Sequence, residues 1–318
     1  MGKIVTLGEV LVEIMATKRG QGFRTPGHFI GPFPSGAPAI FIDQVAHLNY
    51  PCGIISCVGD DDFGHLNIDR LKRDGVDVSA INVISEFTTG SAFVNYKLNG
   101  EREFIFNITN SACAHISLTA AGEKLLQECS HFHIMGSSLF SSSIIESVKM
   151  AVNAVKNRGG TISFDPNIRK EILRLQGMRE ATDFILKNSD MVLPSGPEIT
   201  LLTDADDEDD AIEEILGLGV SEIVLKRGNE GCSYFDRNQR LSMPAYGAEE
   251  IDPTGAGDCF GGTFVTCRLM DMPVVDALRY ANASGAIAVS RKGPMEGTST
   301  FGELDEYLSC NQFQNGIY

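Results

Sequence analysis

Residues 251–262 read Ile-Asp-Pro-Thr-Gly-Ala-Gly-Asp-Cys-Phe-Gly-Gly, and this pattern predicts a helix that begins near Ala256, with Thr254 as its capping residue. The free backbone amides of Gly255, Ala256 and Gly257 would point at one spot, which the helix dipole makes attractive to an anion. Glycine at 255 and 257 removes the Cβ atoms that would keep a large anion away from the backbone. The stretch therefore predicts an anion-binding helix start.

Asp258 lies in the first turn of the same predicted helix. A carboxylate there would repel a bound anion, so we expect it to accept a proton from a hydroxyl that attacks the anion. Phosphoryl transfer needs this combination, with donors on the transferred group and a base on the nucleophile. Gly-x-Gly alone is a weak signal, because an ordinary helix start with an acid in its first turn also shows it. The complete string is much more specific.

Outward from this helix, short apolar runs alternate with helix-like segments, which predicts an α/β fold with a mostly parallel sheet covered on both faces. Such sheets bind ligands at the carboxyl ends of their strands. The strand-like runs are IVTLGEVLVEIM, GIISCVG, FHIMGSS, TISFDPN, DMVLPS and EIVLKRG. Helices are expected near 37–49, 63–73, 142–158 and 209–217, and two more within 256–290, with a turn at 271–273.

Two regions break this alternation. Residues 17–35 are rich in Gly, Pro and Phe, and residues 87–108 look like strands without helices, with a hairpin turn at Asn99-Gly100. We therefore expect a small β element, built from roughly 10–33 and 87–108, that projects from a single domain spanning residues 1–318.

Composition limits the partners. The 318 residues are 43% hydrophobic and 21% charged, as in globular proteins, and the net charge is −16. This acid excess argues against nucleic acid or an anionic membrane surface as the main partner. It remains compatible with a small phosphorylated ligand that backbone amides and Mg²⁺ hold locally.

The chain looks cytoplasmic. Its eight cysteines include no Cys-x-x-Cys pair, which is typical of reduced thiols, and no apolar run reaches membrane-spanning length. The apolar N-terminus carries Lys3, Glu9 and Glu13 and lacks a cleavage site, so it is read as a first strand and not as a signal peptide. The acidic run 204–210 (DADDEDD) is read as a solvated loop and first helical turn, not as a metal site.

Several segments besides 251–262 occur in the order found in ribokinase-like (PfkB-type) sugar kinases, whose late signature is Asp-x-x-Gly-Ala-Gly-Asp. They are Gly8-Glu9, 35–39 (SGAPA), 58–64 (VGDDDFG), 164–169 (FDPNIR) and 226–228 (KRG) with Gly231. The sequence resembles that family over nearly its whole length. The resemblance implies a ribokinase-like, three-layer α/β/α fold with a small β lid.

The resemblance also implies roles for individual residues. Asp258 would be the base on the sugar hydroxyl, and the amides of Gly255, Ala256 and Gly257 would hold the γ-phosphate of ATP. The residues implied to contact the sugar are Glu9, Glu13, Gly36, Asn167 and Arg169. Glu198 would act on hydrated Mg²⁺, and the residues on the ATP side would be Lys226, Gly228, Gly231, Thr254, Asn282, Ala283 and Gly285. A monovalent-cation requirement and a homodimer formed through lid strands are compatible with the resemblance.

Four positions depart from the family pattern. Ser35 stands where the family usually has glycine, and Ile40 where it often has asparagine, which puts part of the sugar contact set in doubt. Ser195 replaces the asparagine of Asn-x-x-Glu but leaves Glu198 in place, and Thr263 replaces a Gly or Ala. None of these changes touches the base or the anion hole.

The sequence narrows the class of sugar substrate but does not identify one sugar. Gly-Glu-x-x-x-Glu and Asp-Pro-Asn-x-Arg look most like the fructokinase and 2-keto-3-deoxygluconate kinase branch. Keto-acid kinases place an arginine shortly before a Ser-Ala pair, whereas Ile108 stands there before Ser111, and Arg102 is the one nearby arginine. A buried carboxylate without a cationic partner is unfavourable. The sequence therefore favours a neutral ketohexose such as fructose or tagatose, with 2-keto-3-deoxygluconate as the alternative.

Two alternative functions belong to other classes of protein. A catalytically silent sugar- or nucleotide-binding regulator would keep the fold but should have lost the base, and Asp258 is present. A nicotinamide-dependent dehydrogenase is disfavoured because the first strand is followed by Gly-Glu-Val-Leu and not by Gly-x-Gly-x-x-Gly.

Overall fold

The computed structural model describes residues 2–99, 101–167 and 177–311. Its main element is a nine-stranded sheet in the order β13-β12-β11-β10-β9-β8-β1-β4-β5. Neighbouring strands from β11 to β5 are parallel, whereas β12 and β13 add an antiparallel hairpin at one edge. The strands, in chain order, are β1 (Lys3–Leu7), β4 (Cys52–Gly59), β5 (Asp77–Ile84), β8 (Cys129–Met135), β9 (Thr161–Asp165), β10 (Met191–Val192), β11 (Glu222–Lys226), β12 (Cys232–Phe235) and β13 (Arg240–Met243).

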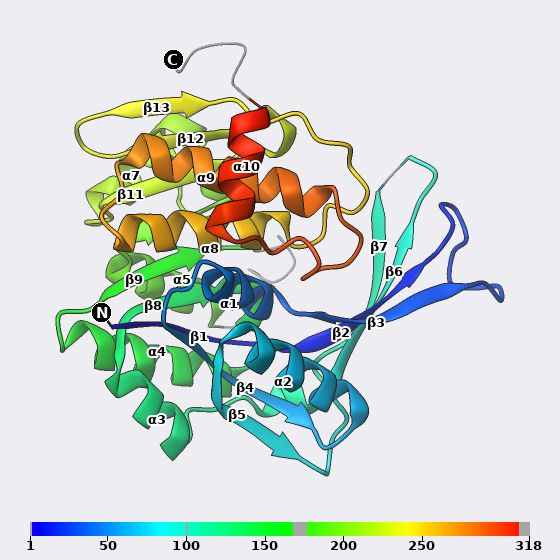
Figure 1. Ribbon diagram of the computed structural model, residues 1–318. Coiled ribbons are helices and arrows are strands. Elements are labelled where there is room, and N and C mark those ends of the chain that lie inside the picture. The colour runs from blue at the N-terminus through cyan, green and yellow to red at the C-terminus, as the bar shows by residue number, and fades with distance from the viewer. Residues whose placement is uncertain (1, 100, 168–176, 312–318) are drawn as a thin grey trace.

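Helices cover both faces of this sheet (Figure 1). On one face lie α1 (Ala37–His47), α2 (Asp62–Asp74), α8 (Ala256–Leu269), α9 (Val274–Val289) and α10 (Phe301–Cys310). On the other lie α3 (Ala120–Gln127), α4 (Ser142–Lys156), α5 (Met178–Asn188) and α7 (Glu208–Gly217), while the short α6 (Glu198–Leu201) follows β10. The predicted ribokinase-like, three-layer α/β/α fold is confirmed.

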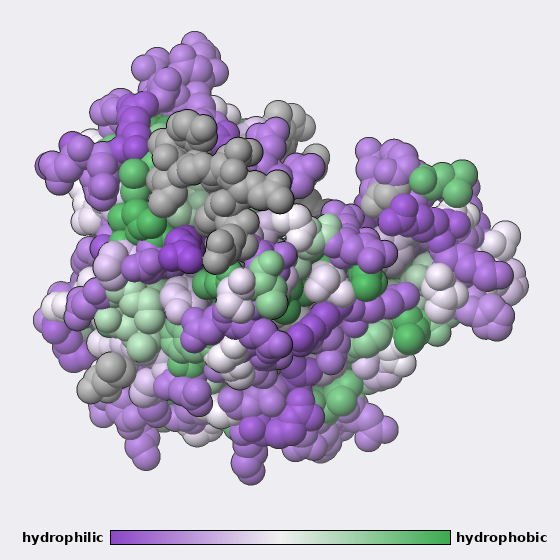
Figure 2. Space-filling view, turned by 45° about the horizontal axis from the view of Figure 1, so that its top comes forward, coloured by the Kyte–Doolittle hydropathy of each residue, from purple (hydrophilic) through white to green (hydrophobic). Residues whose placement is uncertain are grey.

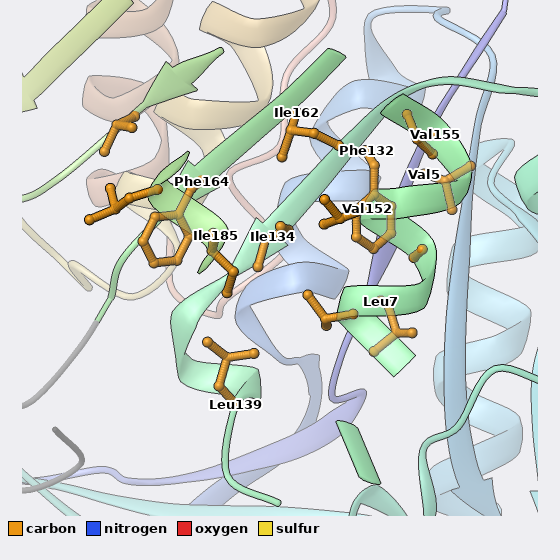
Figure 3. Close-up of a cluster of buried hydrophobic side chains, with 14 of the residues drawn as sticks. Val5, Leu7, Phe132, Ile134, Leu139, Val152, Val155, Ile162, Phe164 and Ile185 are labelled. Carbon is orange, nitrogen blue, oxygen red and sulfur yellow. The ribbon is translucent and has the colours of Figure 1, made fainter. Parts of the chain in front are cut away.

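Alternating burial along the strands explains the two layers. In β1, Val5 and Leu7 join the cluster under α3 and α4, whereas Ile4 joins the cluster under α1 and α8. Successive strand side chains point to opposite faces, so an apolar run of this length supplies both cores. Figure 3 shows the first cluster, in which Val5 and Leu7 gather with Phe132 of β8 and Val152 of α4.

A second, four-stranded sheet in the order β3-β2-β6-β7 projects from the main body (Figure 1). Its strands are β2 (Leu11–Ala16), β3 (Phe29–Ser35), β6 (Gly90–Tyr96) and β7 (Arg102–Asn107). They arise from the two regions that break the helix–strand alternation. The hairpin ladder of β6 and β7 ends at the pair Tyr96 and Arg102, beside the predicted turn, and Gly100 of that turn lies outside the described residues.

The strand-like run IVTLGEVLVEIM contributes to both sheets. β1 ends at Leu7, and β2 begins at Leu11 in the small sheet, in agreement with the expectation that the small β element starts near residue 10. The buried Gly8 and Glu9 lie between them, so the chain passes from one sheet to the other at this point. Among the described residues, the α-helices and strands that the sequence analysis does not predict are α3, α5, α6, α10, β5, β12 and β13. The acidic run behaves as predicted, because Asp207 caps α7 and Glu208, Asp209 and Asp210 form its first turn.

Among the described residues, no helix combines the length and hydropathy needed to cross a bilayer. On the face in Figure 2, hydrophilic residues predominate and hydrophobic residues form small separate patches. Seven of the eight cysteines are buried free thiols, and Cys310 is exposed.

Candidate active site

A cavity of about 700 Å³ lies where the carboxyl ends of parallel strands meet the starts of α1 and α8, and the small sheet forms its roof. We call it the strand-end cavity. Its lining includes Glu9, Leu11, Glu13, Ser35, Gly36, Ile40, Arg102, Phe104, Phe106, Ile108, Ser137, Phe140, Asp165, Asn167, Ser195, Lys226, Thr254, Gly255, Gly257 and Asp258. Strand ends of a parallel sheet commonly form such ligand sites. Ten of the residues singled out from the sequence are thus brought together.

The helix start at the cavity is built around Gly255. Gly255 is the N-cap of α8 with φ 82°, and a Cβ there would lie 2.4 Å from the carbonyl oxygen of Pro294, so only glycine fits. The predicted cap by Thr254 is wrong, because its hydroxyl donates to Asp252 at 2.8 Å and no side chain caps α8. Gly255 and Gly257 line the cavity, whereas the amide of Ala256 donates to the carbonyl of Pro253 at 3.4 Å.

Asp258 occupies the first turn of α8 and is partly accessible from the cavity. Burial raises the pKa of Asp258 to about 8, the charge of Asp165 adds to the rise, and the ammonium group of Lys226 opposes it. A carboxyl group with a pKa near neutrality can both take up and release a proton at physiological pH. The geometry thus places a titratable acid beside the amides of a helix start.

Glu9 follows β1 and is 4% exposed. The hydroxyl of Ser137 donates to its Oε1 at 3.0 Å and that of Ser138 donates to its Oε2. Burial raises the pKa of Glu9, although these hydroxyls oppose the rise. Gly36, the N-cap of α1 with φ 115°, packs against the same segment, because a Cβ there would lie 2.4 Å from the carbonyl oxygen of Glu9.

Glu13 lies on β2 and is 6% exposed. The hydroxyl of Ser35 donates to its Oε1 at 2.7 Å, while its buried Oε2 has no hydrogen-bond partner. Burial raises the pKa of Glu13 to about 7, and the Ser35 hydroxyl and the charge of Arg102 oppose the rise. A buried oxygen without a partner is unfavourable, so Glu13 is ready to receive a donor from a ligand.

Four further polar residues line the cavity. Lys226, at the end of β11, forms an ion pair with Asp165 at the end of β9. Asn167, just beyond β9, has a left-handed backbone with φ 37°, which is rare outside glycine and is frequent at functional sites. Arg102 reaches in from β7, and its Nη1 donates to the Thr254 hydroxyl at 2.8 Å.

Other predicted site residues lie away from the strand-end cavity. Gly228 and Gly231 form a turn after β11, joined by the amide of Gly231 and the carbonyl of Gly228 at 3.1 Å. Asn282, Ala283 and Gly285 lie on α9, which packs against α8, and the Asn282 side chain donates to the sulfur of Cys232 at 3.3 Å. Arg169 falls outside the described residues.

Glu198, the predicted magnesium residue, begins α6, and its Oε2 accepts from the amide of Ser195 at 2.7 Å. Within the described ranges, the one cluster of three candidate metal ligands is Asp43, His47 and Asp74. Arg70 forms ion pairs with both aspartates of that cluster, so a cation already compensates them.

Sequence reasoning missed several residues of the site. Asp165 stood inside a quoted motif without a role, and Asp252 lay within the opening stretch. Asp252 is fully buried and holds the turn before α8, because it accepts from the Thr254 amide at 3.1 Å and the Gly293 amide at 3.2 Å. The Ser pair after FHIMG carried a usable signal, since hydroxyls directly follow a buried strand.

Known proteins are similar along the whole chain. The model of the pfkB family carbohydrate kinase matches residues 1–300. Fructokinase-2 of Oryza sativa subsp. japonica is 29% identical over 317 residues, which cover 96% of this chain and 94% of that protein. A fructokinase double mutant from Vibrio cholerae O395, with fructose, ADP and potassium ion bound, is 25% identical with a TM-score of 0.82, over 97% of this chain and 98% of that one.

An E. coli protein provisionally named Ribokinase II is 53% identical over 98% of this chain and 100% of its own. Its apo form superposes with a TM-score of 0.95, and its complex with ATP and Mg²⁺ with 0.94. The family model and this relative both match the segments of the chain that line the strand-end cavity. The chain therefore belongs to the pfkB family of carbohydrate kinases and is a sugar phosphotransferase.

Proposed function

We propose that this kinase transfers the γ-phosphate of ATP to a hydroxyl group of a neutral ketohexose such as fructose or tagatose. The observation that carries the proposal is that Asp258 and the start of α8 share one cavity with two buried glutamates, Glu9 and Glu13. The helix start offers donors for a phosphate, and the glutamates offer polar groups for a sugar.

In the proposed reaction, ionised Asp258 accepts the proton of the attacking sugar hydroxyl. Gly255 and Gly257 line the cavity, and their amides would stabilise the charge of the transferred phosphate. Preorganised donors of this kind need no rearrangement when the charge develops, which makes them effective. The Ala256 amide contributes less, since it already contacts Pro253.

Sugar recognition is proposed for Glu9, Glu13, Gly36 and Asn167. With its pKa raised to about 7, the Glu13 carboxyl is partly neutral at neutral pH and can then both donate to and accept from sugar hydroxyls, while the buried Glu9 can accept from them. A site with buried polar groups rejects analogues that leave those groups unpaired.

One observation supports 2-keto-3-deoxygluconate as a second candidate. Arg102 lines the strand-end cavity and donates to Thr254, so a guanidinium group is available for a substrate carboxylate. In this alternative, Ile40 would face a part of the substrate that lacks a hydroxyl, because its apolar side chain stands in the lining beside Gly255.

ATP and Mg²⁺ are proposed as cofactors. Mg²⁺ commonly binds through one or two carboxylates together with substrate phosphates, and it neutralises phosphate charge. Glu198 is fixed beside Ser195, a cavity residue, and fits such a role. Gly228, Gly231, Asn282, Ala283 and Gly285 form the proposed nucleotide side, along the turn after β11 and α9. A monovalent cation is a further candidate, since the Vibrio relative binds potassium.

The small sheet is proposed to act as a lid that keeps water from the phosphate. Its inner face presents Phe104 and Phe106 to the cavity, while Phe29, Phe93 and Ile105 remain exposed. An exposed apolar face of this kind supports a homodimer formed through the lid.

A coupled assay of ADP formation with fructose, tagatose and 2-keto-3-deoxygluconate tests the proposal. Preferred turnover of a neutral ketose supports it, preferred turnover of the keto acid selects the alternative, and sugar binding without any ADP formation would identify a silent regulator.

A further inference from the structure

Lys226 has an unusual place for a lysine. Its side chain is 11% exposed and reaches the floor of the strand-end cavity, where it pairs with Asp165, whose side chain is 2% exposed. Burial works to lower the pKa of Lys226, but the neighbouring carboxylates, Asp165 first among them, outweigh burial and raise it. The ammonium group therefore stays charged at neutral pH.

The ammonium group also lies at the positive end of a helix. A Cβ built on Gly257, in the first turn of α8, would lie 3.6 Å from the Nζ of Lys226. Cations stabilise a helix at its C-terminal end, so the position of Lys226 at the N-terminal end of α8 does not stabilise that helix. Together with the α8 amides, it makes a spot at which positive charge converges.

Asp165 holds Lys226 with one oxygen only. Its Oδ2 forms the ion pair, whereas its buried Oδ1 makes no well-formed hydrogen bond, although the backbone of Asn167 lies near enough to oppose the rise that burial causes in the pKa of Asp165. An ion pair whose role is purely structural is expected to satisfy its remaining lone pairs, because burying them otherwise is unfavourable. The incomplete pair leaves Lys226 free to exchange one anion for another.

We propose that Lys226 binds the phosphate group during its transfer, moving from Asp165 to a phosphate oxygen above the first turn of α8, and that its charge keeps the neighbouring base Asp258 ionisable. This inference rests on the proposed function of the same cavity. No new covalent step is involved, since the proton still passes from the sugar hydroxyl to Asp258.

The charged groups that face Asp258 predict opposite effects for the two members of the pair. They are Lys226 from β11, Asp165 from β9, Glu9 from the segment between β1 and β2, and Glu13 from β2. Loss of the Lys226 charge should shift the ionisation of Asp258 to higher pH, whereas loss of the Asp165 charge should shift it to lower pH.

The first experiment compares Lys226→Met with Lys226→Arg. For Lys226→Met we expect kcat to fall on the order of 10²–10³-fold, as for loss of one transition-state donor, with a smaller change in KM for ATP. The pH at which kcat/KM for the sugar reaches half its maximum should rise by about 1–3 units. Lys226→Arg should restore part of kcat and return that pH toward the wild-type value.

Lys156→Met is the control for loss of a lysine–aspartate ion pair outside the cavity. Lys156 pairs with Asp190 at 3.0 Å, and Asp190 accepts from the amide of Ile162 near the start of β9, at the opposite end of that strand from Asp165. This more exposed pair should be dispensable, so Lys156→Met should leave kcat and the pH profile unchanged. Because Lys226→Met leaves Asp165 buried without a cation, the double variant Asp165→Asn/Lys226→Met provides a neutral pair of similar shape. The double variant should show the same loss of kcat as Lys226→Met.

The second experiment is the pH profile of Asp165→Asn, for which we expect a shift to lower pH. Equal kcat and profiles in the Lys226→Met, double and Lys156→Met variants would overturn the inference, as would shifts of the same sign for Lys226→Met and Asp165→Asn. The proposed function fails separately: Asp258→Asn with wild-type kcat would remove the base, even if Lys226 variants lose phosphate transfer.

Discussion

The floor and the roof of the strand-end cavity are built on different principles. The floor comes from strand ends and helix starts of the main body, where Glu9 and Asp165 are nearly inaccessible to solvent. The roof comes from β7, an edge strand of the projecting sheet, whose Arg102 and Phe106 remain exposed. Residues on a rigid, buried floor hold a fixed geometry, whereas an exposed edge strand can move and vary.

From this difference we expect the floor to carry phosphate transfer and the contacts that all sugar substrates share, and the roof to select between neutral and acidic sugars. Changes in the floor should reduce turnover of every sugar, whereas changes in the roof should affect sugars unequally.

The largest effect is expected for Asp258→Asn. An amide cannot accept the hydroxyl proton, so kcat should fall on the order of 10²–10⁴-fold for all sugars, while KM for ATP changes little. Steady-state kinetics at saturating ATP measures both constants. An unaltered kcat would contradict the assignment of the base and leave the floor without its central residue.

The pH dependence of stability tests the raised pKa of Asp258 independently of the kinetics. The pKa of Asp258 lies above its ordinary value, so the folded protein keeps this proton up to a higher pH than the unfolded chain does. The stability that protonated Asp258 contributes is therefore present below about pH 4 and is lost as pH rises toward 8. Thermal unfolding should find Asp258→Asn more stable than the native chain at pH 9, with little difference near pH 4.

The pH dependence of the native enzyme is the next test. Because Asp258 must be ionised to act as base and its pKa is about 8, kcat/KM for the sugar should rise with pH up to about 8 and then level off. Below that pH, activity should fall about tenfold for each unit. A profile that is flat between pH 6 and 9 would exclude Asp258 as the group whose ionisation controls the reaction.

The floor was more predictable from sequence than the roof. Gly255, Gly257 and Asp258 are contiguous, and helix-start physics connects them without knowledge of the fold. Glu9 and Asn167 also follow from the rule that parallel strands end at one edge of a sheet. The partners of these residues, Ser138 for Glu9 and Lys226 for Asp165, are 61 or more residues away in sequence and could not be assigned.

The roof shows where sequence reasoning reached its limit. The strands of the small sheet were anticipated, but not that Arg102, Phe104 and Phe106 share its inner face. Alternation of side chains along β7 explains this once the strand's bounds are known, because a shift of one residue would have pointed Glu103 and Ile105 inward.

Glu198→Gln changes a residue at the edge of the floor. Its effect on activity should lie between those of Asp258→Asn and Arg102→Ala. If the carboxylate acts on hydrated Mg²⁺, the amide should raise the Mg²⁺ concentration needed for half-maximal activity about tenfold, as for other residues that contact a metal through water. Titration of activity with Mg²⁺ at fixed ATP measures the change. Thr200→Ala on the same short helix is a control, since its exposed hydroxyl only contacts the carbonyl of Pro197.

The smallest effect on a neutral sugar is expected for Arg102→Ala. Its guanidinium group contacts Thr254 and the ring of Phe104, so its loss should change kcat/KM for a neutral ketose by no more than about threefold. A keto acid should lose about 10–100-fold, because a charge-assisted hydrogen bond to its carboxylate disappears. Glu103→Ala, on the opposite face of β7 and next to Asn95, should affect neither substrate. Equal losses on both substrates would mean that Arg102 positions the turn before α8 through Thr254, and the division between floor and roof would then fail at this residue.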